Sequence, residues 1–119
     1  EGESGPYLQY AYARASSILR KPKIKTSKLQ IEQPNQYEIK LAKKILEFPE
    51  VVEQAERNFS PSTIANYSFQ LAQIFNEFYH NCKVIGDKKE KMRIELVKAF
   101  RNTIKSSLYL LGIDVMEQM

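Results

Sequence analysis

Residues 60–82 read SPSTIANYSFQLAQIFNEFYHNC and carry large apolar side chains three or four positions apart. Side chains at that spacing lie on one face of an α-helix, which has about 3.6 residues per turn. Ser60 followed by Pro61 is typical of a helix start, because serine caps a helix and proline suits its first turn. The stretch therefore predicts one long helix with a single buried face. That face contains Ile64, Tyr67, Leu71, Phe75 and Phe78.

Two shorter helices are predicted before the long one. Asn35 and Glu38 have the spacing of a capping box, which predicts a helix over residues 36–47. Pro49 interrupts the pattern and begins another helix over residues 49–58. The side chains expected to face the core are Ile39, Ala42, Ile45 and Leu46 in the former and Val51, Val52 and Ala55 in the latter.

The chain is predicted to begin with a helix over residues 5–20, because Pro6 suits a first turn. Residues 21–34 then form a basic connector that includes two prolines. The apolar face of this first helix contains Leu8, Ala15 and Leu19.

A last helix is predicted to start where Asp87 and Glu90 repeat the capping-box spacing, and to run to about Leu111 before the terminator Gly112. No segment of any length alternates with the period of two that marks a half-buried strand. The sequence thus predicts an all-α protein, a five-helix bundle with short loops and one basic connector. The inward residues expected in the last helix are Leu96, Phe100, Thr103, Ile104, Ser107, Leu108 and Leu111.

Composition narrows the class of protein. A chain of 119 residues with 43% apolar residues is expected to form one domain with a real core. The net charge is +4 and the pI about 9.1, which is compatible with nucleic-acid binding. A single cysteine excludes an internal disulfide framework and favours a reducing compartment, so we expect a cytoplasmic protein. No apolar run approaches the roughly 18 residues needed to span a bilayer. The chain opens on Glu1, so we expect a piece of a longer protein.

Beside the apolar face of the first helix, Tyr7, Tyr10 and Arg14 fall on one narrow stripe. Aromatic rings beside a guanidinium are suited to holding unstacked nucleic-acid bases. The alternative is structural, with the tyrosines at the edge of the core and their hydroxyls in water.

A second aromatic flank lies at the end of the long helix, where Tyr79 is followed by His80 and Lys83. It combines a ring with nearby polar and cationic groups, as the first helix does. Two such flanks in a helical bundle are able to line one cleft.

Metal and catalytic sites are not indicated. Glu77 and His80 have the spacing of half a di-iron motif, but such sites need two motifs and further glutamates, and the chain has one histidine. Cys82 lacks the partners that a zinc site requires. We expect no cofactor, no metal and no catalytic residue in this chain.

Several short motifs lie along the chain in a fixed order. They are Gly5-Pro6-Tyr7-Leu8-Gln9-Tyr10-Ala11 with Arg14 and Ile18-Leu19; Leu46-Glu47-Phe48-Pro49-Glu50-Val51-Val52; Leu71-Ala72-Gln73, Phe75-Asn76, Phe78-Tyr79 and Asn81-Cys82; and Leu110-Leu111-Gly112-Ile113 with Met119. Together they resemble the C-terminal, DALR-type anticodon-binding domain of arginyl-tRNA synthetases. The match spans nearly the whole chain, although no contiguous Asp-Ala-Leu-Arg run occurs.

The resemblance implies that residues 1–119 are a single helical anticodon-binding domain, a C-terminal fragment of a class I synthetase. Such a domain grips the anticodon loop of an arginine tRNA, whose middle cytosine is the family's main determinant. A separate catalytic domain of the same chain uses ATP to activate arginine, and its His-Ile-Gly-His and Lys-Met-Ser-Lys-Ser signatures are missing here. We expect ligase activity only from that portion, a monomeric protein and no membrane partner.

The resemblance also assigns site residues. Tyr7, Tyr10 and Arg14 match positions that contact the splayed anticodon loop, and Tyr79 matches an aromatic position in the same site. Met119 matches a C-terminal methionine beside the anticodon. The full set of candidate tRNA-binding residues is Tyr7, Tyr10, Arg14, Asn76, Tyr79, His80, Lys83 and Met119.

Two departures from the family pattern alter these expectations. Lys83 stands near a position that is aromatic in some relatives, which favours a phosphate contact over base stacking. Gln118 stands where relatives commonly have arginine, so one charge near the site is absent.

Other functions remain open. The nearest alternative is the related domain of a cysteinyl or glycyl synthetase, against which the Leu-Leu-Gly-Ile ending and terminal methionine argue. More distant alternatives are a helical protein-interaction module and a carboxylate-bundle enzyme. Comparing tRNA species, testing peptide affinity and measuring bound metal would separate them.

Overall fold

The computed structural model describes residues 4–21 and 32–115. Within these ranges the chain is helical with no strand, which confirms the all-α prediction. Most of the predicted basic connector, residues 22–31, lies outside the described residues. None of the described helices is apolar over a stretch long enough to cross a membrane. The helices are α1 (Ser4–Arg20), α2 (Gln36–Leu46), α3 (Phe48–Asn58), α4 (Pro61–Asn81) and α5 (Glu90–Leu110).

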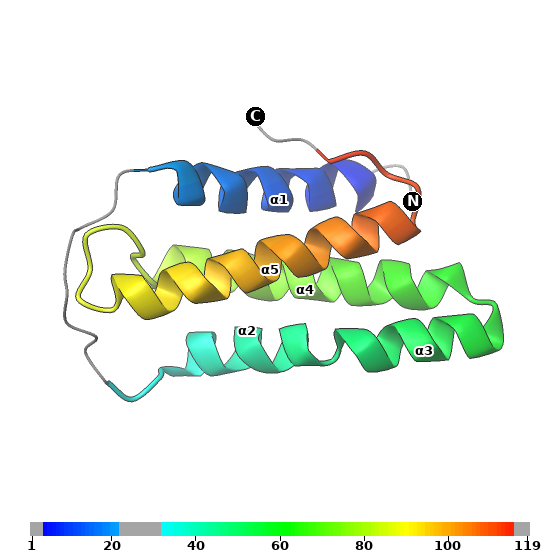
Figure 1. Cartoon of the computed structure of the whole chain (residues 1–119), viewed down its shortest axis with the longest axis horizontal. Coiled ribbons are helices and arrows are strands. Elements are labelled where there is room, and N and C mark those ends of the chain that lie inside the picture. Colours follow the sequence, from blue (N-terminus) through cyan, green and yellow to red (C-terminus); the bar gives the residue numbers. More distant parts are fainter. Residues whose placement is uncertain (1–3, 22–31, 116–119) are drawn as a thin grey trace.

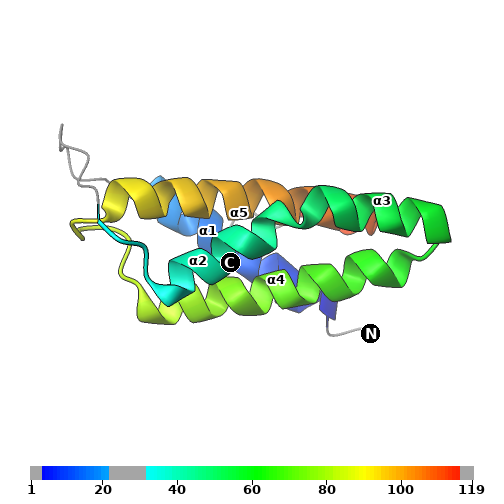
Figure 2. The ribbon, with the colours of Figure 1, turned by 90° about the horizontal axis from the view of Figure 1, so that it is seen from below.

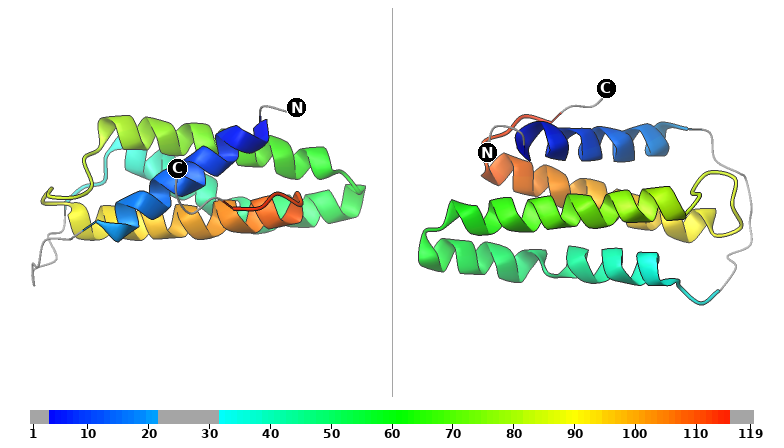
Figure 3. Two further views of the ribbon diagram at one scale, coloured as in Figure 1. Left: turned by 90° about the horizontal axis from the view of Figure 1, so that it is seen from above. Right: turned by 180° about the vertical axis from the view of Figure 1, so that it is seen from behind.

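The five helices form three layers (Figure 1). The long helices α4 and α5 lie side by side in the middle, and α1 crosses both of them obliquely on one side (Figure 3). On the other side, α2 and α3 run almost end to end across the same pair (Figure 2). The loop between α4 and α5 lies at the end of the bundle where α1 ends and α2 begins.

The core forms where these layers meet α4. All five residues predicted for the buried face of α4 are buried, as the sequence pattern indicated. Phe75 of α4 stacks face to face on Phe100 of α5, with ring centroids 4.0 Å apart. Tyr12 of α1 and Val97 of α5 are also fully buried, although the sequence patterns did not single them out.

The predicted inner face of α2 is partly wrong. Ile39 is 40% exposed and Leu46 is 78% exposed, whereas Leu41 is completely buried. The helix is rotated because Glu38 points inward to ion pairs with α5, so the buried stripe passes through Glu38 and Leu41 rather than Ile39.

Two of the predicted helix caps differ from expectation, and one is confirmed. Asn35 and Glu38 form the complete capping box at the start of α2. Ser60 occupies the N-cap of α4, but its hydroxyl bonds to that of Ser62 rather than capping the backbone. The capping box expected at Asp87 is absent, because α5 begins only at Glu90.

The loop before α5 explains that difference. Gly86 adopts a φ of +89°, a backbone conformation that favours glycine. The turn brings its N–H to Glu90 Oε1 at 2.7 Å, while Asp87 Oδ2 accepts from the N–H of Lys89 at 2.9 Å. Both carboxylates thus accept hydrogen bonds from the loop backbone and stabilise the loop, instead of forming a capping box. At the other end of α5, Gly112 has a φ of +73° and ends the helix as predicted.

Candidate nucleic-acid interface

The crossing of α1 over α4 brings together several residues predicted for the site. Arg14 Nη1 donates a hydrogen bond to Asn76 Oδ1 at 2.9 Å. Asn76 Nδ2 in turn donates to the hydroxyl of Tyr7 at 2.9 Å. A single amide on α4 therefore links a guanidinium and a phenol that lie two helical turns apart on α1.

The Arg14 guanidinium also covers the ring of Tyr79. Its Cζ atom lies 4.3 Å from the ring centroid, in the geometry of a cation–π contact. Tyr79 remains 37% exposed, and its ring meets the His80 ring edge to face at 5.3 Å. Arg14, Asn76, Tyr7 and Tyr79 thus form one connected group, called here the aromatic cluster.

The cluster retains its positive charge. Among the described residues, the groups that contact Arg14 are the amide of Asn76 and the ring of Tyr79, and neither carries a net charge. The guanidinium has five N–H donors, and one is used in the bond to Asn76. The arrangement therefore presents a half-buried cation and an exposed aromatic ring, which can hold a planar, electron-rich group with hydrogen-bond acceptors.

Tyr10 lies on the same side of α1 and is 51% exposed. It stands one turn from both Tyr7 and Arg14, as the stripe in the sequence indicated. Its ring is available for a contact with a bound partner.

Phe69 is a member of the site that the sequence reasoning did not select. Its ring lies 5.0 Å from that of Tyr7, and it is partly exposed on α4. The signal was present, because Phe69 stands seven residues before Asn76 and so shares its face of α4. An open groove of about 640 Å³ continues from Phe69 toward the start of α1. Its lining includes Gly5, Leu8, Phe69, Gln70, Leu111 and Ile113.

The remaining predicted residues lie at or beyond the edge of the cluster. His80 is exposed and contacts it through Tyr79. Lys83 lies just past the end of α4 with its side chain exposed, while its carbonyl accepts from Arg93 Nη1 at 2.7 Å. Met119 lies outside the described residues.

Glu77, one of the two residues considered for a metal site, is engaged in an ion pair. Glu77 pairs with Lys40 at 3.4 Å across α4 and α2. In the described part of the chain, no three His, Cys, Asp or Glu side chains come close enough together to hold a metal ion.

Known proteins resemble this chain in both sequence and fold. A family model described as the DALR anticodon binding domain matches residues 8–119. The arginine–tRNA ligase of Flavobacterium psychrophilum is 40% identical over 99% of this chain, which covers 20% of that protein. The arginine–tRNA ligase of Methanoregula boonei is 45% identical over 100% of the chain, which covers 21% of that protein.

A solved structure of an arginyl-tRNA synthetase has the same fold over this region. The arginyl-tRNA synthetase of Thermus thermophilus matches with a TM-score of 0.81 at 35% identity, over 96% of this chain and 21% of that one. The chain thus spans about a fifth of the length of the proteins that it matches.

Proposed function

Because this chain belongs to the DALR anticodon-binding domain family, we propose that it grips the anticodon loop of an arginine tRNA for an arginyl-tRNA synthetase. The aromatic cluster carries this proposal. It presents the guanidinium of Arg14 and the partly exposed ring of Tyr79, and the exposed ring of Tyr10 lies next to it on α1. An anticodon loop is read with its bases turned out, and such bases stack on aromatic rings and arginine planes.

Arg14 is the residue best placed to read a base edge. The Watson–Crick edge of cytosine offers two adjacent acceptors, the ring N3 and the carbonyl O2, and a guanidinium donates two parallel hydrogen bonds to such a pair. Uracil presents an N–H in place of the N3 acceptor and loses one of these bonds. The middle cytosine of the arginine anticodons is therefore the base that we assign to this cluster.

The chemistry of aminoacylation belongs elsewhere in the longer protein. Activation of arginine with ATP falls to a catalytic domain in the remaining four fifths of the relatives' length. The cluster draws its residues from α1 and α4 of one chain, so a monomer is sufficient for anticodon recognition. We propose a cytoplasmic location from the single cysteine of the chain.

Binding to two anticodon stem-loops tests the proposal. The 119-residue chain is titrated at low salt against an arginine anticodon stem-loop and against a copy in which the middle cytosine is uracil. We expect the cytosine copy to bind about tenfold more tightly, because a good bidentate contact discriminates by about 1–3 kcal/mol. Equal affinity for the two copies contradicts base reading. Stem-loops with the cysteine and glycine anticodons share the middle cytosine, so a preference for the arginine stem-loop over them tests contacts to the flanking bases and separates the arginyl assignment from the related synthetases.

A further inference from the structure

One end of the bundle carries an excess of positive charge. The described residues 20–21, 32–38 and 82–93 contain seven lysines and arginines but four aspartates and glutamates. They comprise the end of α1, the approach to α2 with its first turn, the loop after α4 and the first turn of α5. These segments lie together at one end of the molecule (Figure 1).

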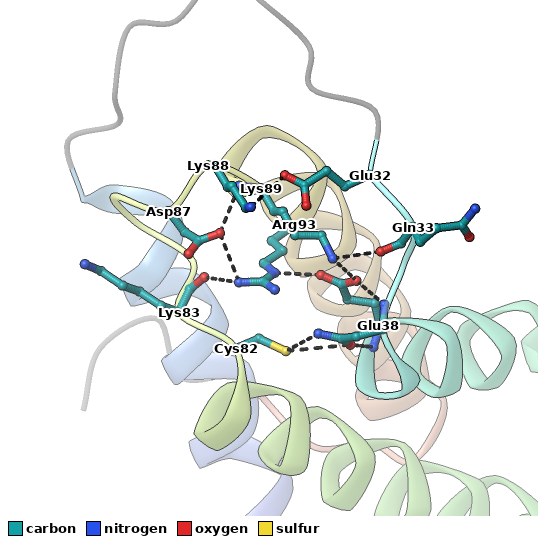
Figure 4. Close-up of polar contacts among 10 residues, drawn as sticks. Glu32, Gln33, Glu38, Cys82, Lys83, Asp87, Lys88, Lys89 and Arg93 are labelled. Atoms are coloured by element: carbon teal, nitrogen blue, oxygen red, sulfur yellow. Dashed lines mark hydrogen bonds and ion pairs between the residues drawn. The ribbon is translucent and has the colours of Figure 1, made fainter.

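Most of the carboxylates at this end point inward. The Glu38 side chain is 1% exposed and accepts from Lys89 Nζ at 2.8 Å and from Arg93 Nε at 2.6 Å. Asp87 pairs with the same arginine at 3.4 Å (Figure 4). Burial raises the pKa of Glu38, but the hydrogen bonds from Lys89 and Arg93 outweigh it and leave the pKa lowered. The carboxylate thus stays charged and is neutralised within the protein.

The other cations at this end point outward. Arg20, Lys21, Lys83 and Lys91 are exposed to solvent. Lys88 pairs with Glu32 at 3.2 Å, yet its side chain remains 65% exposed, and exposed pairs of this kind are weak. These five residues, Arg20, Lys21, Lys83, Lys88 and Lys91, are called here the basic end.

The basic end lies beyond the aromatic cluster along two helices. Arg20 follows Arg14 by six residues on α1, a rise of about 9 Å. Lys83 follows Tyr79 by four residues at the end of α4. Lys83 is thus the basic-end cation nearest in sequence to the exposed ring of the cluster.

We infer that the basic end binds the phosphodiester backbone of the RNA whose bases occupy the aromatic cluster. This inference rests on the proposed function and assigns the backbone contacts to a separate surface. The favoured ligand is RNA rather than an acidic protein, because the cations adjoin aromatic rings suited to stacking bases. Contacts to phosphate position an RNA without reading its sequence.

Salt dependence tests the assignment. The test variant combines Lys83→Gln, Lys88→Gln and Lys91→Gln. The matched control combines Lys43→Gln, Lys98→Gln and Lys105→Gln, which removes the same charge from exposed sites on the sides of α2 and α5. Lys98 matches Lys88, because it too is in an exposed ion pair, with Glu95 at 3.3 Å.

Affinity for the arginine stem-loop is measured from 50 to 200 mM salt. Each phosphate contact in a single strand contributes roughly 0.7 to the slope of log affinity against log salt, so the test variant should lose about 2 units of slope. Over that fourfold range of salt, the fold-loss of affinity should therefore be about 20-fold smaller for the test variant than for the unmodified chain. The control should keep the slope of the unmodified chain.

The outcomes separate this inference from the proposed function. Loss of slope in the test variant alone, with an unchanged preference for cytosine over uracil, supports it. An unchanged slope with cytosine preference intact overturns the inference and leaves anticodon reading in place. Equal losses in both variants also overturn it, since the attraction is then spread over the whole surface. Competition by polyglutamate as strong as by the stem-loop overturns it in favour of an acidic protein partner. A slope loss without any base preference retains the backbone surface and removes the anticodon assignment.

Discussion

Replacement of Tyr10 by alanine should weaken RNA binding and leave the fold intact. Tyr10 is 51% exposed on α1, and the largest fully buried side chains of that helix, Leu8 and Tyr12, point away from it. Substitution of an exposed residue away from packed contacts usually changes stability by less than about 0.5 kcal/mol. A stacked base lost from an aromatic ring costs about 1–3 kcal/mol, which is roughly a 5- to 150-fold rise in Kd.

The assay is fluorescence anisotropy of a labelled arginine anticodon stem-loop, paired with urea unfolding of each variant. Tyr109→Ala is the matched control, because Tyr109 is 82% exposed on α5 and lies outside the cluster. Tyr10→Ala should raise Kd by at least about fivefold while Tyr109→Ala leaves it unchanged. If Tyr10→Ala instead lowers the unfolding free energy by about 2 kcal/mol or more, the ring belongs to the core and the binding argument is refuted.

Three further changes follow from the contacts described above. Phe100→Ala should cost about 3–5 kcal/mol of unfolding free energy in urea, because the fully buried ring stacks on Phe75; a loss below about 1 kcal/mol would contradict the packing of α4 on α5. Glu38→Ala should cost about 3–5 kcal/mol, since it removes the buried carboxylate shared by Lys89 and Arg93 and leaves Arg93 only its longer 3.4 Å pair with Asp87, whereas Glu53→Ala, at an exposed pair, should cost under about 1 kcal/mol. The folded-state pKa of Glu38 lies below its ordinary value of 4.5, so its stabilisation is present above that pH and is lost as the pH falls through the folded-state pKa. The difference in unfolding free energy between the unmodified chain and Glu38→Ala should therefore shrink as the pH is lowered from 7 to 3, and a difference that does not change with pH would exclude this role. Asn76→Ala should weaken stem-loop binding by about 2- to 13-fold with the cytosine preference retained, while loss of the preference alone would make Asn76 a base contact.

Sequence patterns predicted the helices well where the pattern depends on residues of one helix only. The apolar stripe of α4 and the capping box of Asn35 needed only the spacing of side chains along one helix. The face of α2 was predicted less well, because a buried carboxylate occupies it. Hydrophobic patterns do not anticipate that Glu38 is neutralised by Lys89 and Arg93, residues more than fifty positions away.

The site residues were likewise predictable where the signal lies within one helix and not where it depends on a contact between helices. The stripe of Tyr7, Tyr10 and Arg14 was visible because it repeats within one helix. The junction of Arg14 with Asn76 was not, since these residues are 62 positions apart and meet only when α1 crosses α4. Phe69 was overlooked for a related reason. It joins the site only through its contact with the ring of Tyr7, which forms where α1 crosses α4.

Asn76 explains how the crossing prepares the cluster for a ligand. Its carbonyl holds the guanidinium of Arg14 and its amide holds the hydroxyl of Tyr7, so the two bonds fix its orientation. A free arginine side chain loses about 2 kcal/mol of rotamer entropy when it is ordered. Arg14 is ordered by folding, through Asn76 on one side and the Tyr79 ring on another, so less of this cost remains when RNA binds. The amide therefore strengthens binding without touching the base, and its effect depends on the packing of α1 on α4 rather than on either helix alone.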